Sequence, residues 1–256
     1  MIDSIHYEPG SAVMDERIVL VTGAGSGIGR AVSLALAQFG AKVVLFGRTR
    51  SSLETLSDKI VAMGAPQPSI LHADLEKLTW DDYLSMATTL DEEFGRLDGL
   101  LHNAGILGDR SPIEHYDPMT WHRVMHVNLS APFLMTRALL PLLKKSQDPA
   151  LLFTSSGVGR TGRAFWGAYA VSKFGTEGLM QVLADELGDV RVNCINPGPT
   201  KTAMRTAAYP AEDPKKPAEP ASLASAYLYL LGPDSHGITG QTFDAQSSDT
   251  SIPAQR

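Results

Sequence analysis

The segment from Arg17 to Gly40 constrains the fold more than any other stretch of the chain. RIVLVTG (17–23) is a short apolar run, rich in β-branched residues, which is typical of a buried parallel strand. In the following segment, 23–40, apolar residues recur at helical spacing and Gly40 marks a stop. A strand that passes through a glycine-rich turn directly into a helix is the opening unit of a dinucleotide-binding sheet.

The same alternation of strand and helix continues along the chain. Further strands are expected at 42–47, 68–75, 97–105, 150–156, 189–198 and 239–245, and further helices at 49–64, 80–95, 118–145, 167–187 and 221–231, with a loop at 203–220. This pattern predicts an α/β fold, a single doubly wound Rossmann-type parallel sheet with helices on both faces. The domain is expected over 16–245, with an N-terminal extension over 1–15 and a C-terminal tail over 246–256.

Composition excludes several classes of function. The formal net charge is −6 and no basic block of five residues occurs, which argues against nucleic acid as a partner. No apolar run reaches the roughly 18 residues of a membrane span, and the N-terminus lacks the apolar core of a secretory signal. We therefore expect no membrane association and a cytoplasmic location. Cys194 is the only cysteine, so no intrachain disulfide is expected.

The turn TGAGSGIG (22–29) is suited to hold phosphates. A first glycine permits a tight turn, and later ones let the backbone approach a pyrophosphate and let the helix pack on the strand. The helix N-terminus offers free N–H groups and a partial positive charge. The cofactor-binding residues expected here are Gly23, Gly25, Ser26, Gly27, Ile28 and Gly29.

Arg48 indicates which dinucleotide is bound. In dinucleotide-binding sheets, an acid that contacts the ribose 2′-hydroxyl commonly stands at the end of the second strand, where this chain has Gly47 and Arg48 instead. A guanidinium is suited to a 2′-phosphate. The sequence therefore favours NADP(H), with NAD(H) still possible. The alternative is that Arg48 is only a solvated loop residue.

Tyr169 and Lys173 suggest acid–base chemistry. They are four residues apart and so share one face of the expected helix. A positive charge beside a phenol lowers the pKa of the tyrosine, which can then exchange a proton with a carbonyl or an alcohol. Alone, this spacing also describes an ordinary surface helix.

Taken together, these motifs resemble those of the short-chain dehydrogenase/reductase family in its short single-domain form. TGAGSGIG resembles its TGxxxGxG motif, HNAG (102–105) its NNAG motif, and PGPTKT (197–202) its PGxVxT motif. Ser156, Tyr169 and Lys173 match its catalytic set, including the step of thirteen residues from serine to tyrosine. The resemblance covers residues 16–245. The chain is also similar to a bacterial subgroup of poorly characterised oxidoreductases that share the FDAQ end.

The resemblance implies an NADP(H)-dependent oxidoreductase that interconverts a carbonyl and a secondary alcohol by hydride transfer. Tyr169 is then the acid in reduction and the base in oxidation, and it also belongs to the expected cofactor-binding residues. Ser156 binds the substrate oxygen together with Tyr169. Lys173 binds the nicotinamide ribose and lowers the pKa of Tyr169. Asn128 interrupts its helix and holds a water that links Lys173 to solvent.

The remaining implications concern the cofactor, the partners and the departures from the family pattern. Asp74, Leu75 and Asn103 are expected to line the adenosine side, and Thr200 and Thr202 to hold the carboxamide end. A small-molecule carbonyl or alcohol is the expected substrate, and a homodimer or homotetramer is expected through helices 118–145 and 165–187. His102, where the family has asparagine, is expected to be structural.

Two alternatives complete the predictions from sequence. His122 and His126 are four apart, but no third ligand is near them, so no metal site is expected. A non-catalytic dinucleotide-binding sensor or scaffold on the same fold is the alternative function, because a fold does not fix an activity.

Overall fold

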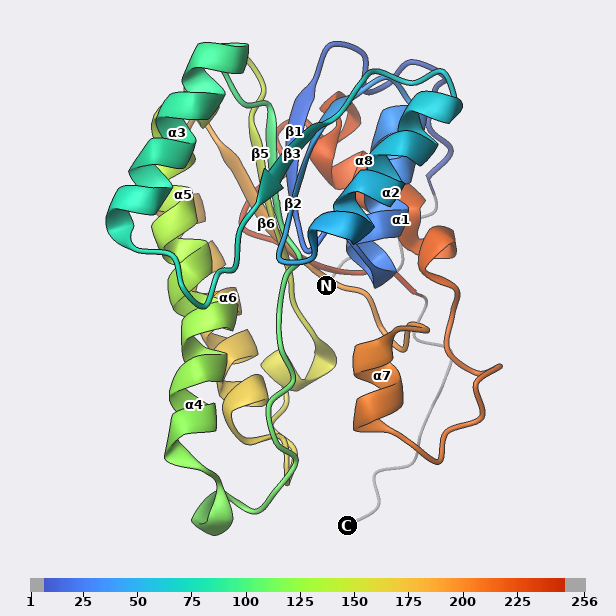
Figure 1. The fold of residues 1–256 in the computed structure, drawn as a ribbon. Helices are drawn as coiled ribbons and strands as arrows, with labels where there is room; N and C mark the ends of the chain where they lie inside the picture. Colours follow the sequence, from blue (N-terminus) through green and yellow to red (C-terminus); the bar gives the residue numbers. More distant parts are fainter. Residues whose placement is uncertain (1–6, 247–256) are drawn as a thin grey trace.

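Seven parallel strands form one sheet at the centre of the structure, a computed structural model that describes residues 7–246 (Figure 1). The strands are β1 (Ile18–Thr22), β2 (Lys42–Gly47), β3 (Ser69–His72), β4 (Gly99–His102), β5 (Ala150–Thr154), β6 (Arg191–Asn196) and β7 (Thr242–Asp244). Their order across the sheet is β3-β2-β1-β4-β5-β6-β7, so the winding reverses between β1 and β4. Ligands bind outside the carboxyl ends of the strands at such a reversal.

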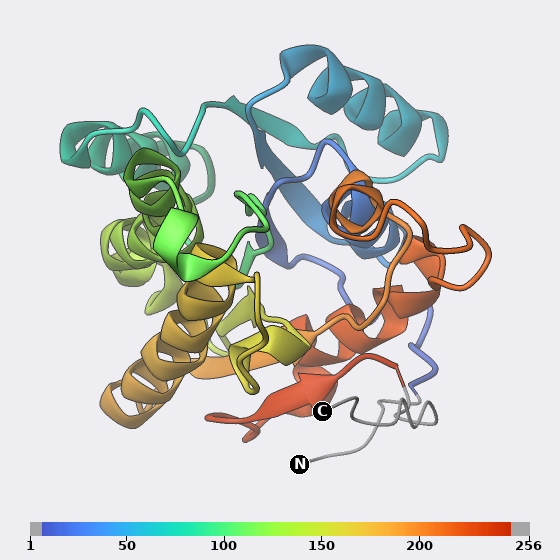
Figure 2. The same ribbon diagram turned by 90° about the horizontal axis from the view of Figure 1, so that it is seen from below.

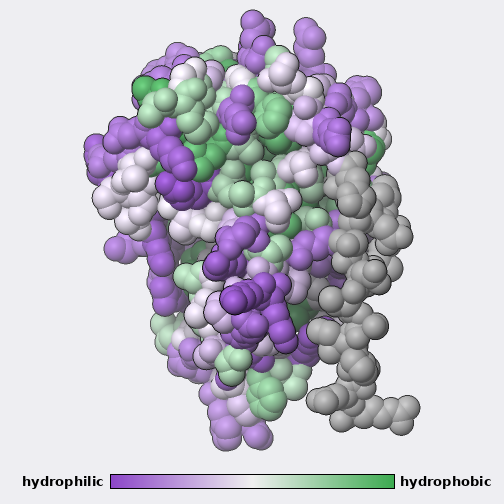
Figure 3. Space-filling model, turned by 90° about the vertical axis from the view of Figure 1, so that its right-hand side faces the viewer, coloured by the Kyte–Doolittle hydropathy of each residue, from purple (hydrophilic) through white to green (hydrophobic). Residues whose placement is uncertain are grey.

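Helices cover both faces of the sheet, which confirms the predicted doubly wound architecture (Figures 1 and 2). One face carries α1 (Gly27–Gln38), α2 (Arg50–Ala62) and α8 (Ala224–Leu231), and the other carries α3 (Trp80–Phe94), α5 (Ala131–Leu143) and α6 (Gly167–Glu186). Because side chains alternate along a strand, Val19 and Val21 pack into the first layer while Ile18 and Leu20 pack into the second. The side of the molecule that carries α1, α2 and α8 mixes hydrophobic and hydrophilic residues (Figure 3).

The long helix expected at 118–145 is divided into three parts. It begins as α4 (Pro118–Met125), passes through a π-helical turn (His126–Ser130), and continues as α5. The wider turn leaves the regular hydrogen-bond ladder at Asn128, as the resemblance implied for this helix. Tertiary contacts of the Asn128 side chain, described below, accompany the interruption.

The prediction of a loop at 203–220 was wrong in one part, because this segment begins with a short helix, α7 (Ala203–Ala208). Its N-terminus is capped by Thr202, whose hydroxyl accepts a hydrogen bond from the Arg205 N–H at 3.1 Å. The alanine-rich sequence that follows favours a helix, and the prolines beyond it end the helical pattern.

The segment before β1 packs on the domain. Met14 is completely buried in the layer of α1 and α8, and its N–H donates to the Phe39 carbonyl at 3.0 Å. The Tyr7 hydroxyl donates to Asp234 at 2.7 Å. Residues 1–6 of the expected extension and residues 247–256 of the expected tail lie outside the described residues. Within residues 7–246, no helix is long and apolar enough to cross a membrane.

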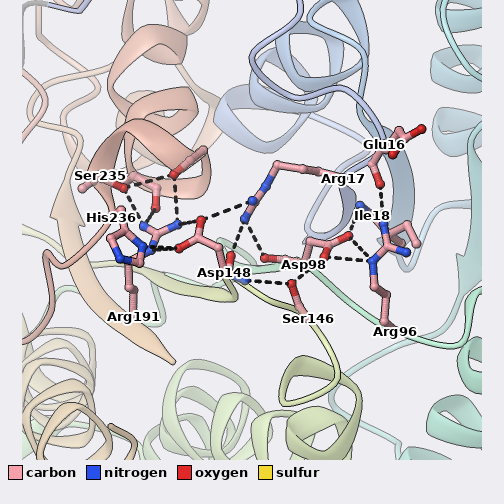
Figure 4. Close-up of polar contacts among 12 residues, drawn as sticks. Glu16, Arg17, Ile18, Arg96, Asp98, Ser146, Asp148, Arg191, Ser235 and His236 are labelled. Atoms are coloured by element: carbon pink, nitrogen blue, oxygen red, sulfur yellow. Dashed lines mark hydrogen bonds and ion pairs between the residues drawn. The ribbon is translucent and has the colours of Figure 1, made fainter. Parts of the chain in front are cut away.

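An ionic network joins the strands at the edge where they begin (Figure 4). The Arg191 guanidinium, at the start of β6, donates to both carboxylate oxygens of Asp148 at 3.0 and 2.9 Å. Arg17, just before β1, donates to the same carboxylate at 3.3 Å. Asp98, just before β4, accepts from the Ile18 N–H at 2.9 Å. This edge of the sheet is fixed by charge pairs, and the opposite edge carries the residues expected to bind ligands.

Candidate active site

The residues predicted to act together follow the carboxyl ends of five strands. Gly23 follows β1, Arg48 follows β2, Asn103 follows β4, Ser156 lies shortly after β5 and Thr200 shortly after β6. The parallel sheet therefore brings residues that are far apart in sequence to one edge.

The glycine turn has the geometry that requires glycine. Gly23 and Gly27 have positive φ angles of 69° and 52°. A side chain at Gly29 would overlap the Gly23 carbonyl oxygen and stand 2.6 Å from Asn103 Nδ2. Asn103 in turn donates from Nδ2 to the Thr22 carbonyl at 3.1 Å, which fixes the end of β4 against the end of β1. The close packing of helix on strand predicted for this turn is present.

Two helices present uncapped N-termini to this edge. Neither α1 nor α2 has a side-chain cap, and neither has an acid in its first turn. By contrast, α3 has a capping box formed by Thr79 and Asp82, and its first turn contains two acids. The free N–H groups of α1 and α2, with the positive ends of their dipoles, are suited to bind anions.

A pocket of about 260 Å³ lies between these two N-termini. Six of the predicted cofactor residues line it: Gly23, Gly25, Ser26, Arg48, Asp74 and Leu75. Other lining residues escaped prediction, among them Phe46, Thr49, Ser52, Ile106 and Val127. Thr49 and Ser52 lie just beyond Arg48 in the sequence, so their hydroxyl groups could have been predicted to line the same site. Ile106 and Val127 reach the pocket only through the tertiary fold.

The other predicted cofactor residues surround this pocket. The methyl carbon of Thr202 lies 3.2 Å from the position of a Cβ at Gly27, so the segment after β6 reaches the glycine turn. The Thr200 hydroxyl is buried and donates to the Gly198 carbonyl at 3.1 Å. Ile28 lies in the first turn of α1 and packs against the core.

Ser156, Tyr169 and Lys173 come together beside this edge. Tyr169 and Lys173 are both buried on α6, and the Ser156 hydroxyl is hydrogen-bonded to the Tyr169 phenol. Lys173 Nζ donates to the Thr154 carbonyl at 2.7 Å and lies 5.8 Å from the centre of the Tyr169 ring. A Cβ at Gly159 would stand 2.9 Å from Lys173 Cβ, so the loop after Ser156 packs directly on α6.

The expected lowering of the Tyr169 pKa by Lys173 was wrong for this structure. Burial raises the pKa of Tyr169, and the hydrogen bond from Ser156 only partly opposes that effect. The lysine amine points to a backbone carbonyl rather than to the phenol. Burial also lowers the pKa of Lys173, from its ordinary 10.5 to about 8. At neutral pH the tyrosine is therefore protonated and the lysine still largely charged.

Asn128 links three segments around Lys173. Its Oδ1 accepts from the Ile106 N–H at 2.8 Å, and its Nδ2 donates to the Ile106 carbonyl at 2.9 Å and to Ser172 Oγ at 3.1 Å. The loop after β4 is thereby attached to the π-helical turn and to α6. The role of Asn128 in holding a water stays a prediction.

The FDAQ end attaches β7 to the loops on either side of the site. Asp244 pairs with Arg160, at 2.5 Å, and accepts from Asn196 Nδ2 at 2.7 Å. Gln246 Nε2 donates to the Pro197 and Pro199 carbonyls at 2.6 and 3.0 Å. Arg160 lies in the loop after Ser156, and Pro197 and Pro199 precede Thr200, so this end of the chain supports both loops.

Two histidines near this edge, His102 and His126, have structural contacts. His102 Nε2 is within 2.8 Å of Thr136 Oγ1, and its ring stacks on Phe153 at 4.9 Å. Burial lowers the pKa of His102 to about 3, so it is neutral. His126 Nε2 lies 3.1 Å from the Leu75 carbonyl. Across the described part of the chain, no three or more histidine, cysteine, aspartate or glutamate residues are grouped to hold a metal.

Comparison with known proteins agrees with this geometry. A family model described as short chain dehydrogenase matches residues 17–213. The uncharacterized oxidoreductase YciK of Escherichia coli (strain K12) is 50% identical over 243 residues, which cover 94% of this chain and 96% of that protein.

Two solved structures of short chain dehydrogenases resemble this chain as closely in sequence as YciK does. One, from Shigella flexneri 2a and complexed with NADP, is 50% identical with a TM-score of 0.91, covering 93% of this chain and all (100%) of that one. Another, from Escherichia coli CFT073 and complexed with NADPH, is 51% identical with a TM-score of 0.91 and the same coverage of 93% and 100%. The sequence motifs, the fold, the arrangement of Ser156, Tyr169 and Lys173, and these relatives together show that the chain belongs to the short-chain dehydrogenase/reductase family.

Proposed function

We propose that this protein is an NADP(H)-dependent oxidoreductase that interconverts a carbonyl and a secondary alcohol, with Tyr169 as the acid–base residue. The observation that carries the proposal is the hydrogen bond between Ser156 and Tyr169, one helical turn from Lys173 and at the sheet edge that holds the glycine turn. A binding protein alone would not need a phenol, a hydroxyl and an amine buried together.

The lining of the pocket suits the adenosine and phosphate end of a dinucleotide that carries a 2′-phosphate. The α1 N-terminus and the glycine turn suit a pyrophosphate, because side chains are absent where the backbone must come close. Arg48, Ser52 and the uncapped N-terminus of α2 line the same pocket and together supply a positive charge, a hydroxyl and free N–H groups. The complexes of the two relatives with NADP and NADPH support the same choice.

The residues of the chain divide the remaining work. The bound nicotinamide would donate or accept the hydride. In reduction, Tyr169 gives its hydroxyl proton to the carbonyl oxygen, and its raised pKa keeps that proton in place at neutral pH. Ser156 donates a hydrogen bond to the same oxygen and orients it. Lys173 binds the ribose hydroxyls, and Asn128 holds the segments that surround the lysine.

The test is turnover by Tyr169→Phe over a panel of aldehydes and ketones, with NADPH and NADH run in parallel. The acid–base contribution predicts a loss of about 10²-fold or more. Cofactor affinity should stay within about 2-fold, because Lys173 and the glycine turn, rather than the Tyr169 hydroxyl, are expected to make the main contacts with the dinucleotide. Activity near wild type in this variant would contradict the proposal. Tight NADPH binding with no turnover on any compound would instead favour a non-catalytic sensor.

A further inference from the structure

The surroundings of Tyr169 limit what kind of substrate can reach it. Val158, Trp166 and Ala208 are buried around the tyrosine, and Leu107, Met204 and Tyr209 pack against them. The Trp166 ring centre lies 5.6 Å from that of Tyr169 and 5.8 Å from that of Tyr209. These residues come from α6, from α7 and from the loops after β4 and β5. The part of a substrate that carries the reacting carbonyl must therefore be accommodated among apolar and aromatic side chains.

One positive charge lies at the edge of this apolar cluster. The Arg110 guanidinium is 4.5 Å from the centre of the Trp166 ring and 5.2 Å from that of Tyr209. Its Nη1 donates to the Ala208 carbonyl at 2.5 Å. The two rings restrict the guanidinium while most of its five N–H donors remain at its edges. One aromatic ring, Trp166, separates this cation from Tyr169.

The loop that carries Arg110 is held in place. Gly108 has a φ of 68°, and a Cβ there would stand 2.6 Å from both Tyr116 Oη and Val124 Cγ2. The Asp109 N–H donates to Tyr116 Oη at 3.2 Å. Arg110 is therefore fixed beside the cluster by α4 and its flanking loop, which reduces the entropy lost when a ligand binds it.

Arg110 differs in its charge environment from Arg205 and Arg160, which lie in other segments near the site. Arg205 also stacks on Tyr209, at 3.8 Å, but Glu212 neutralises it through two hydrogen bonds of 2.7 and 2.5 Å. Arg160 is paired with Asp244. Within residues 7–246, no carboxylate lies within ion-pair distance of Arg110. An anion that binds Arg110 therefore has no carboxylate of this part of the chain to displace.

We propose that Arg110 binds an anionic group of the substrate, so that the enzyme acts on carbonyl compounds that carry a carboxylate or a phosphate beyond an apolar segment. The planar guanidinium matches either anion through two parallel hydrogen bonds. The anion takes over the N–H that Ala208 accepts from in the present structure. The carbonyl then extends past Trp166 to Ser156 and Tyr169. This inference rests on the proposed function, because it assigns the substrate class of the same site.

The test measures binding to the NADP⁺-loaded protein by calorimetry, so that no turnover is needed. Three ligands share one oxoalkyl chain: 5-oxohexanoate, its methyl ester, and 4-oxopentyl phosphate. At least one anion should bind about 10-fold or more tightly than the ester, and the comparison of the two anions decides between carboxylate and phosphate. Arg110→Met should reduce that preference to within about 2-fold while the ester binds as before, and Arg110→Lys should restore part of it.

The matched control is Arg163→Met, which removes an equal charge from an exposed arginine in the neighbouring loop. It should retain the preference for the anion. Equal affinities in the wild type, or no binding of any of the three ligands, would overturn the proposal. The proposal would also be overturned if Arg110→Met weakened the binding of the ester and of the anion equally. That result would mean that Arg110 only holds α7 in place. Tyr169→Phe should weaken the ester and the anions alike and keep the preference for the anion, so failure of the acid–base assignment is recognised separately.

Discussion

Lys173 is a residue whose proposed function opposes stability. Its side chain is 6% exposed, and burial lowers its pKa from 10.5 to about 8, so the folded protein holds a charge in a place that disfavours it. We predict that Lys173→Met raises the free energy of unfolding at pH 7 by about 2 kcal/mol, after allowance for the lost bond to Thr154. The same variant should lose turnover and bind NADPH more weakly. Urea unfolding measures the first effect.

The shifted pKa of Lys173 also predicts how the stability difference between Lys173→Met and the wild type changes with pH. The unfolded chain keeps the lysine proton up to its ordinary pKa of 10.5, and the folded chain only up to about 8. Between these values the unfolded state binds more protons, so wild-type stability rises with pH. The advantage of Lys173→Met should be full below about pH 8 and should disappear towards pH 10.5. An advantage that stays constant across this window would show that charge burial is not its cause.

At the scale of single residues, the sequence predicted which residues of the proposed site meet better than it predicted their pKa values. The spacing of Ser156, Tyr169 and Lys173 was sufficient to predict that they meet, because an α-helix fixes the last two and the strand before Ser156 ends at the same edge. The direction of the Tyr169 pKa was not predictable, since it depends on burial and on where the lysine amine points. Arg110 was missed for a similar reason, because only the tertiary fold stacks it on Trp166.

At the scale of elements, the last strand and its FDAQ end support the loop that carries Thr200. Gln246→Glu keeps the shape of the side chain but replaces two N–H donations, to the Pro197 and Pro199 carbonyls, with repulsion between oxygens. Because the loop also reaches Gly27 through Thr202, we predict that NADPH binds about 10-fold more weakly. Fluorescence titration with NADPH checks this.

Gln241→Glu is the matched control for that prediction. It makes the same chemical change at an exposed position just before β7. NADPH affinity should stay at the wild-type value in this variant. If both variants weaken NADPH binding alike, the added negative charge is the cause. That result would contradict the role assigned to the two hydrogen bonds of Gln246.

The sequence predicted most elements within a few residues, and its failures have local causes. The resemblance implied an interruption at Asn128, but apolar residues continue through 118–145, and only the contacts of Asn128 with Ile106 and Ser172 show why a π-helical turn divides α4 from α5. The helix α7 was hidden because the prolines and charges of 209–220 dominate the composition of its segment. Short helices depend on caps such as Thr202 and on packing more than on propensity.

At the scale of the whole molecule, one carboxylate connects three parts of the chain. Asp148 forms ion pairs with Arg191 and Arg17, whose side chains are only 7% and 12% exposed. The Nδ1 atom of His236 lies 3.1 Å from Asp148 Oδ1. Asp148→Asn would leave two buried guanidinium groups without their counter-charge, so we predict a loss of about 3 kcal/mol in the free energy of unfolding. Urea unfolding at pH 7 measures this loss.

The network also predicts how stability changes in acid. Burial by itself would raise the pKa of Asp148, but the hydrogen bonds from Arg191 and His236 and the charges of Arg191 and Arg17 lower it below its ordinary 3.8. Its contribution is therefore complete above about pH 3.8 and is lost as the pH falls through the folded value. The difference in the free energy of unfolding between the wild type and Asp148→Asn should decrease only below about pH 3.8. Asp91→Asn, at an exposed pair with Lys145, is the control and should cost less than about 1 kcal/mol.

Exposed apolar side chains on α5 and α6 form a surface through which we expect copies of the chain to associate. Phe133 on α5 and Val171, Phe174 and Val182 on α6 are 43–53% exposed, and the two helices lie on the same side of the sheet (Figures 1 and 2). Covering such side chains is the main gain in forming a homodimer or homotetramer. We predict that the wild type sediments as an oligomer and that Phe133→Asp combined with Phe174→Asp sediments as a monomer. Val61→Asp on α2, at an equally exposed apolar position, should leave the oligomer intact. A monomeric wild type, or dissociation by Val61→Asp as well, would contradict the assignment of this surface.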